Sequence, residues 1–176
     1  ADVLIASDGP RVEPEIPTIA TGTRGTFHFD LVLKLRPGGV HSGHWGGVLP
    51  DPGFILAHAM ASIVTPQGRI RVKGWVPQQV PDSVLKATRD IVFEDIPGLP
   101  EADPAWGEPG LSTSEKIFAW TSVIVLAQIT GHPDAPTNAV QGEARARLQV
   151  RHTIDVPGET IIPALRAHLD AAGFPM

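Results

Sequence analysis

The sequence predicts an α+β fold, a two-layer sandwich in which helices cover one face of an antiparallel sheet. Period-two alternation of apolar and polar residues occurs at 26–35 and 143–154, and a β-branched run occupies 121–130. Helical patterns at 52–64 and 159–172 lie between and after these segments. Because alternating strands bury one face, amphipathic helices are expected to pack on that face.

Composition limits the classes of function. The chain has 176 residues, enough for one domain with its own core, and carries a net charge of −5. A nucleic-acid partner would favour a basic face, so none is expected. No apolar run approaches the ~18 residues of a membrane helix, and no export signal is visible, so we expect no membrane association and a cytoplasmic location. The absence of cysteine excludes disulfides and thiolate metal ligands.

The chain begins within an apolar run, residues 3–6, that ends at Asp8-Gly9, as in a strand followed by a turn. We therefore expect it to be a fragment of a longer protein. Asp8 could be a metal ligand at the end of a strand, although a lone Asp-Gly is more often a turn former. A segment with several prolines and glycines then leads to the alternating strand at 26–35. Arg24, in the turn before it, could bind a carboxylate or simply lie on the surface.

A glycine-rich loop, GGVHSGHWGGVLPDP at 38–52, follows the strand and contains His41. Asp51 can accept hydrogen bonds from the first free amides of a helix, and Pro52 is tolerated at its first position, which predicts a helix over 52–64. A loop held between two rigid elements is a frequent place for chemistry. On composition alone, a histidine in such a loop is more often a solvated turn residue than a functional one.

Residues 69–75, RIRVKGW, predict another alternating strand. From 76 to 120 prolines and glycines interrupt the pattern, which indicates an insertion. Within it, a helix capped by Asp82 or Ser83 is expected, followed by a shorter helix that begins with a capping box at Ser112.

The C-terminal part returns to regular elements. Residues 121–130, TSVIVLAQIT, predict a central strand, and 131–142 form a long polar turn. The strand at 143–154 has one apolar and one basic face. The helix at 159–172 tolerates Pro163 only in its first turn and ends at Gly173.

The turn Gly22 to Gly25 and the long strand precede the string HSGHWGG, and a helix that opens with proline follows it. This arrangement resembles the lid (dimerisation) domain of the M20 family of zinc metallopeptidases, in the carnosinase-type dipeptidase branch. The resemblance implies a ferredoxin-like lid over residues 15–176, with an insertion at about 76–120. Residues 1–14 would be the end of a catalytic-domain strand and a hinge. It also implies a homodimer formed through the lid, and a parent enzyme that hydrolyses an amide bond in a dipeptide or N-acyl amino acid.

The same resemblance implies roles for single residues. His41 would reach into the active site of the other subunit and help to hold the substrate carbonyl as negative charge develops. Asn138 and Arg151 would bind substrate, Arg151 through a substrate carboxylate. Asp8 matches an acidic zinc ligand that precedes the lid. The full-length enzyme would hold two zinc ions; because this chain lacks the family's Glu-Glu pair, we expect it to bind none tightly and to be inactive alone.

Two alternatives remain open from the sequence. The chain could be a non-catalytic ferredoxin-like self-association module, or a degenerate small-molecule binding protein. Asn138 could be a turn-forming residue, and Arg151 part of a basic surface strand. The remaining histidines are interpreted as surface or packing residues: His28, His44, His58, His132 and His168.

Overall fold

The computed structural model describes residues 15, 17, 19–20, 22–91, 98 and 100–175. Asp8 and the predicted boundary segment 1–14 lie outside the described residues. Within the described part, no helix combines the length and the apolar character needed to cross a lipid bilayer.

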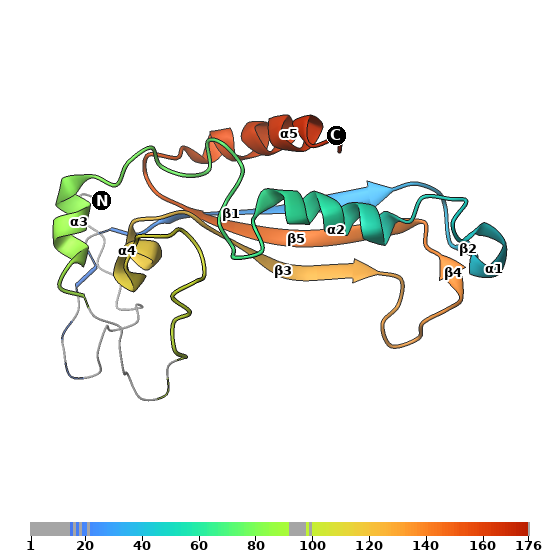
Figure 1. Ribbon diagram of the computed structural model, residues 1–176, viewed down its shortest axis with the longest axis horizontal. Helices are drawn as coiled ribbons and strands as arrows, with labels where there is room; N and C mark the ends of the chain where they lie inside the picture. The colour runs from blue at the N-terminus through green and yellow to red at the C-terminus, as the bar shows by residue number, and fades with distance from the viewer. Residues whose placement is uncertain are drawn as a thin grey trace, which may run out of the picture.

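An antiparallel sheet of β1 (Gly25–Lys34), β5 (Glu143–His152) and β3 (Ser122–Thr130), in that order, is the base of the fold (Figure 1). The register pairs Phe29 with Leu148, and alternate residues of β5 are buried. The period-two patterns at 26–35 and 143–154 are thus confirmed, because one side of each strand faces a core.

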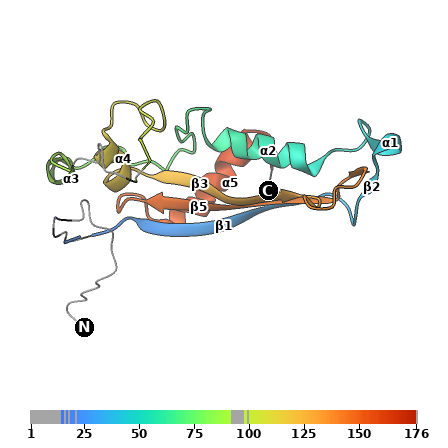
Figure 2. The ribbon, with the colours of Figure 1, turned by 90° about the horizontal axis from the view of Figure 1, so that it is seen from below.

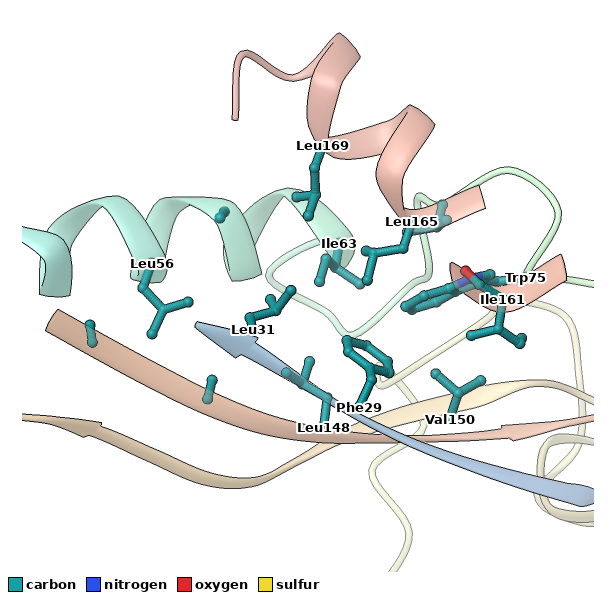
Figure 3. Close-up of a cluster of buried hydrophobic side chains, with 14 of the residues drawn as sticks. Phe29, Leu31, Leu56, Ile63, Trp75, Leu148, Val150, Ile161, Leu165 and Leu169 are labelled. Atoms are coloured by element: carbon teal, nitrogen blue, oxygen red, sulfur yellow. The ribbon is translucent and has the colours of Figure 1, made fainter. Parts of the chain in front are cut away.

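Two helices, α2 (Pro52–Ile63) and α5 (Ile161–Ala171), cover the same face of the sheet (Figure 1), and a 3-10 turn, η1 (Gly158–Thr160), leads into α5. Asp51 caps α2 as expected, with Oδ1 accepting from the amides of Gly53 at 2.8 Å and Phe54 at 3.2 Å. Figure 3 shows side chains of the sheet and both helices meeting in one cluster. The two-layer α+β fold is therefore confirmed. The buried cluster includes Phe29, Leu31, Leu56, Ile63, Val72, Trp75, Leu148, Val150, Ile161, Leu165 and Leu169.

A small projection lies at one end of the main sheet (Figures 1 and 2). It contains a second, two-stranded sheet of β2 (Val40–His41) and β4 (Ala139–Val140), and the short helix α1 (Ser42–Trp45). We call residues 37–50 and 131–141 the finger. No residue of α1 is buried, so backbone hydrogen bonds rather than a core hold its tip.

The opposite end of the sheet carries α3 (Asp82–Thr88) and α4 (Thr113–Phe118) (Figure 1). The capping box at Ser112 is confirmed, with the Ser112 hydroxyl accepting from the Glu115 amide. The predicted cap of α3 is wrong, because the carbonyl of Pro81 already accepts from Val84 and Leu85. Pro81 is therefore the N-cap, and no side chain forms a capping hydrogen bond at this end of α3.

Two further sequence predictions are wrong. Residues 69–75 do not form a strand: in the described structure they contribute an isolated bridge between Ile70 and Val64. Val72 and Trp75, three residues apart, belong to the same buried cluster, whereas residues i and i+3 of a straight strand point to opposite faces. Within the described residues, the main sheet has three strands in place of the four expected. The β-branched run that forms β3 is an edge strand, whereas β5 is central.

Candidate functional site

His41 is the last residue of β2 in the finger, and it is exposed. It is the N-cap of α1, and its Nδ1 accepts a hydrogen bond from the Gly43 amide at 3.1 Å. An amide N–H can only donate, so the neutral ring carries its proton on Nε2. The neutral His41 is therefore fixed as an Nε2–H donor.

The glycine after Ser42 is required by this arrangement. A Cβ at Gly43 would stand 2.8 Å from Cε1 of His41. A Cβ at Gly46 would stand 2.6 Å from the Ser42 carbonyl oxygen. The spacing of histidine and glycines in HSGHWGG therefore has a local steric cause: larger residues would displace the ring or open the turn.

His44 is a neighbour of His41 that the sequence interpretation left as an ordinary surface residue. The centroids of the two rings are 4.9 Å apart, with a 42° angle between the planes. The three-residue spacing between His41 and His44 could have indicated this ring contact, because residues i and i+3 lie on the same face of a helix.

The structure brings Asn138 to the same place. Ala139 pairs with His41 in the β2–β4 ladder, and the Ser42 amide donates to the Asn138 carbonyl oxygen at 2.9 Å. Asn138 thus flanks His41 across the finger, although the two are far apart in sequence.

Arg151 is not part of this cluster. It lies near the other end of β5, where it pairs with Thr26 on β1 and Ser122 on β3. Glu143, the first residue of β5, stands at the finger end. Eight residues of strand at about 3.3 Å each separate Glu143 from Arg151 by roughly 26 Å. Figure 1 shows the finger and this end of β5 on opposite sides of the molecule.

Arg24 stands beside Arg151 and is not the surface arginine expected by default. Its Nη1 donates to the Trp120 carbonyl oxygen at 2.8 Å and to the Ser122 hydroxyl at 3.2 Å. Burial, and then the charge of Arg151, lower the pKa of Arg24. Among the described residues, neither guanidinium has a carboxylate within ion-pair distance. This end of the sheet therefore presents two neighbouring positive charges suited to an anion.

The described residues bring together no group of three or more histidine, aspartate or glutamate side chains that could hold a metal ion. Two His-x-Asp strings occur, at 28–30 and 132–134. In the first, Asp30 Oδ2 accepts from Arg145 at 2.6 Å, and the His28 ring contacts the Gln149 amide at 2.8 Å. These residues do not fit a metal centre. Zinc and the role of Asp8 stay predictions about a larger protein.

Comparisons with known proteins point to a single family, although no protein-family model matches the chain. Beta-Ala-His dipeptidase of Rattus norvegicus is 34% identical over 164 residues, which cover 92% of this chain and 30% of that protein. Cysteinylglycine-S-conjugate dipeptidase of Corynebacterium striatum is 28% identical over 161 residues, covering 86% of this chain and 33% of that protein. The chain thus spans about a third of the length of these curated relatives.

Solved structures share the fold. An M20 family metallo-carboxypeptidase from Sulfolobus solfataricus superposes with a TM-score of 0.76 at 20% identity, covering 95% of this chain and 45% of that one. Human carnosine dipeptidase 1 gives a TM-score of 0.72 at 18% identity, covering 89% and 35% respectively. The sequence relatives and this shared α+β fold agree with the motif at His41. The chain belongs to the M20 family of metallopeptidases and spans part of the length of its relatives.

Proposed function

We propose that this chain is the lid and dimerisation domain of an M20-type peptidase that hydrolyses an amide bond in a dipeptide or N-acyl amino acid. In this proposal His41 acts in trans, in the active site of a second copy. The names of the relatives, Beta-Ala-His dipeptidase and cysteinylglycine-S-conjugate dipeptidase, support the substrate class.

The observation that carries the proposal is the separation of the candidate residues. His41 and Asn138 lie on the finger, whereas Arg151 lies roughly 26 Å along β5 from the finger end. A dipeptide spans roughly 7 Å when fully extended. A single substrate therefore cannot contact both ends of one chain. Both ends can serve one substrate if the finger comes from a second copy.

The chemistry proposed for His41 follows from its tautomer. With Nδ1 occupied by the Gly43 amide, the neutral ring offers an Nε2–H donor to a substrate carbonyl oxygen. A hydrogen bond to that oxygen strengthens as the oxygen gains negative charge, so it favours the transition state over the ground state. Removing one donor of this kind typically lowers kcat by about 10²–10³-fold.

The surface proposed for dimerisation is the edge of β3. Ile124, Val125 and Leu126 are each about half exposed, at 51%, 51% and 47%. The adjacent helix α2 has the sequence PGFILAHAMASI, without any Asp, Glu, Lys or Arg, and its Phe54 is 73% exposed. A helix without a charged face and an apolar edge strand are features of a covered surface. A second copy, related by a two-fold axis, would cover both.

A subunit-mixing experiment tests the proposal in the full-length protein that contains this chain. His41→Ala and Arg151→Ala subunits are each inactive if both residues act on substrate. Heterodimers would combine the intact finger of one copy with the intact Arg151 of the other. Random mixing should therefore restore about a quarter of the wild-type activity. Arg166→Ala, at an exposed position on α5 outside the finger, is the control and should retain full activity.

The outcomes separate the alternatives. No recovery on mixing, with both parent variants folded and dimeric, would contradict the in-trans role. A full-length protein that binds dipeptides without hydrolysing them would favour the binding protein. A protein that dimerises but neither binds nor hydrolyses dipeptides would favour the self-association module.

A further inference from the structure

Arg36 joins separate chain segments at the base of the finger. It lies two residues after the end of β1 at Lys34, and it is partly buried. Nη1 donates to the carbonyl oxygen of Gln141 at 2.6 Å, and Nη2 donates to that of Pro50, also at 2.6 Å. Among the described residues no carboxylate pairs with it. Both contacts are therefore made to backbone, where charge-assisted hydrogen bonds are strong and directional.

The two carbonyls mark the places where the chain returns from the finger to the body. Gln141 follows β4 and leads into β5, and Pro50 precedes the N-cap of α2. Arg36 itself is where the chain leaves β1 for the finger. The Arg36 side chain thus links three chain segments: the one that follows β1, the one that precedes α2 and the one between β4 and β5. Backbone packing is also tight here, because a Cβ at Gly142 would stand 2.4 Å from the Arg36 carbonyl oxygen.

The geometry makes the base of the finger a pivot. His41 is five residues beyond Arg36, up to about 16 Å of extended chain. A rotation of about 10° at the base would move the His41 ring by about 3 Å, because displacement grows with distance from the pivot. Misplacing a group by about 1 Å can cost on the order of 10²-fold in rate.

We infer that Arg36 is a positioning residue, whose two hydrogen bonds set the direction of the finger and so place His41 in the active site of the second copy. The inference rests on the proposed in-trans role of His41. The planar fork of arginine reaches two carbonyls at once, whereas a lysine ammonium at the same place can satisfy one well. The identity of the residue therefore matters as well as its charge.

The test compares variants of the full-length enzyme. Arg36→Met removes the donors and keeps the apolar stem; it should lower kcat about 10- to 100-fold, with KM changed by less than about threefold. Arg36→Lys should fall between Arg36→Met and wild type. Arg166→Met, at an exposed arginine on α5, is the matched control and should leave kcat unchanged.

A double-mutant cycle distinguishes positioning from general support of the fold. If Arg36 acts through His41, Arg36→Met should cause no further loss of kcat in a His41→Ala background. A further loss as large as in the wild-type background would overturn the inference, as would an Arg36→Met enzyme with unchanged kcat. If Arg36→Met does not fold, Arg36→Lys takes its place in the cycle. An unchanged kcat in His41→Ala alone would instead remove the proposed function.

Discussion

Val125 offers a quantitative test of the proposed dimer surface. Its partner in β5, Leu148, is in the core, so Val125 faces the helix-covered side of the sheet, yet it remains 51% exposed. Half of a valine side chain is about 75 Å² of apolar surface, worth about 2 kcal/mol per copy when buried. Because a two-fold axis would bury Val125 of both copies, the free energy of burial would total about 4 kcal/mol per dimer.

The substitution Val125→Asp should therefore weaken dimerisation of the full-length protein by roughly a thousandfold or more. Desolvation of the carboxylates adds to the loss of apolar contact. Sedimentation over a range of protein concentrations measures the dissociation constant. Under the proposal that His41 acts across the dimer, specific activity should fall in parallel on dilution.

Val32→Asp is the matched control for this experiment. Val32 is 49% exposed on β1, the other outer strand of the described sheet. It should leave the dissociation constant unchanged. A Val125→Asp protein that remains dimeric at nanomolar concentration, or a monomeric one with full activity, would refute the reasoning.

Three further predictions concern single contacts. Gly43→Ala should lower kcat more than it raises KM, because its Cβ would meet the His41 ring at 2.8 Å; steady-state kinetics beside a melting curve checks this. Asp51→Ala should destabilise α2 by about 1 kcal/mol through loss of its cap, measured as faster amide exchange in the first turns of the helix. Trp75→Phe should lower the stability of this domain by about 2–3 kcal/mol, because it removes buried volume and the indole N–H that donates to the Ile161 carbonyl oxygen at 2.9 Å. Hydrogen exchange of core amides measures this loss. An unchanged exchange rate would contradict the buried, hydrogen-bonded position of Trp75.

Local rules predicted the elements whose pattern and capping agree. The strand at 26–35 and the helix that begins at Pro52 were predicted because alternation and an N-cap need only neighbouring residues. The capping box at Ser112 was predicted for the same reason.

Long-range packing decided the elements that were mispredicted. Residues 69–75 alternate in sequence, but Trp75 turns inward to donate its indole N–H to the Ile161 carbonyl oxygen, 86 residues away. The β-branched run of β3 suits a central strand or an edge strand that a partner covers, and composition does not distinguish them. The sequence pattern therefore predicted neither the conformation of residues 69–75 nor the neighbours of β3.

In the candidate site too, local sequence patterns predicted some features, whereas others depend on long-range packing. The motif around His41 could be recognised from a short string, and Asn138 was assigned to substrate through the same resemblance. That they lie on one finger, and that Arg151 lies at the other end of β5, depends on strand pairing. The sequence singled out Arg24 but not its bond to the Trp120 carbonyl, and it gave no sign of Arg36, because each bonds to a backbone carbonyl distant in sequence.

The uncovered tip of the finger has an energetic consequence. Since α1 buries nothing, its amides should open and exchange with solvent far more readily than those of β5 while a copy is alone. In the proposed dimer, immobilising that tip would consume part of the free energy released on association. Slowed deuterium uptake at 40–46 would then be a direct signal that the proposed shared active centre has been assembled.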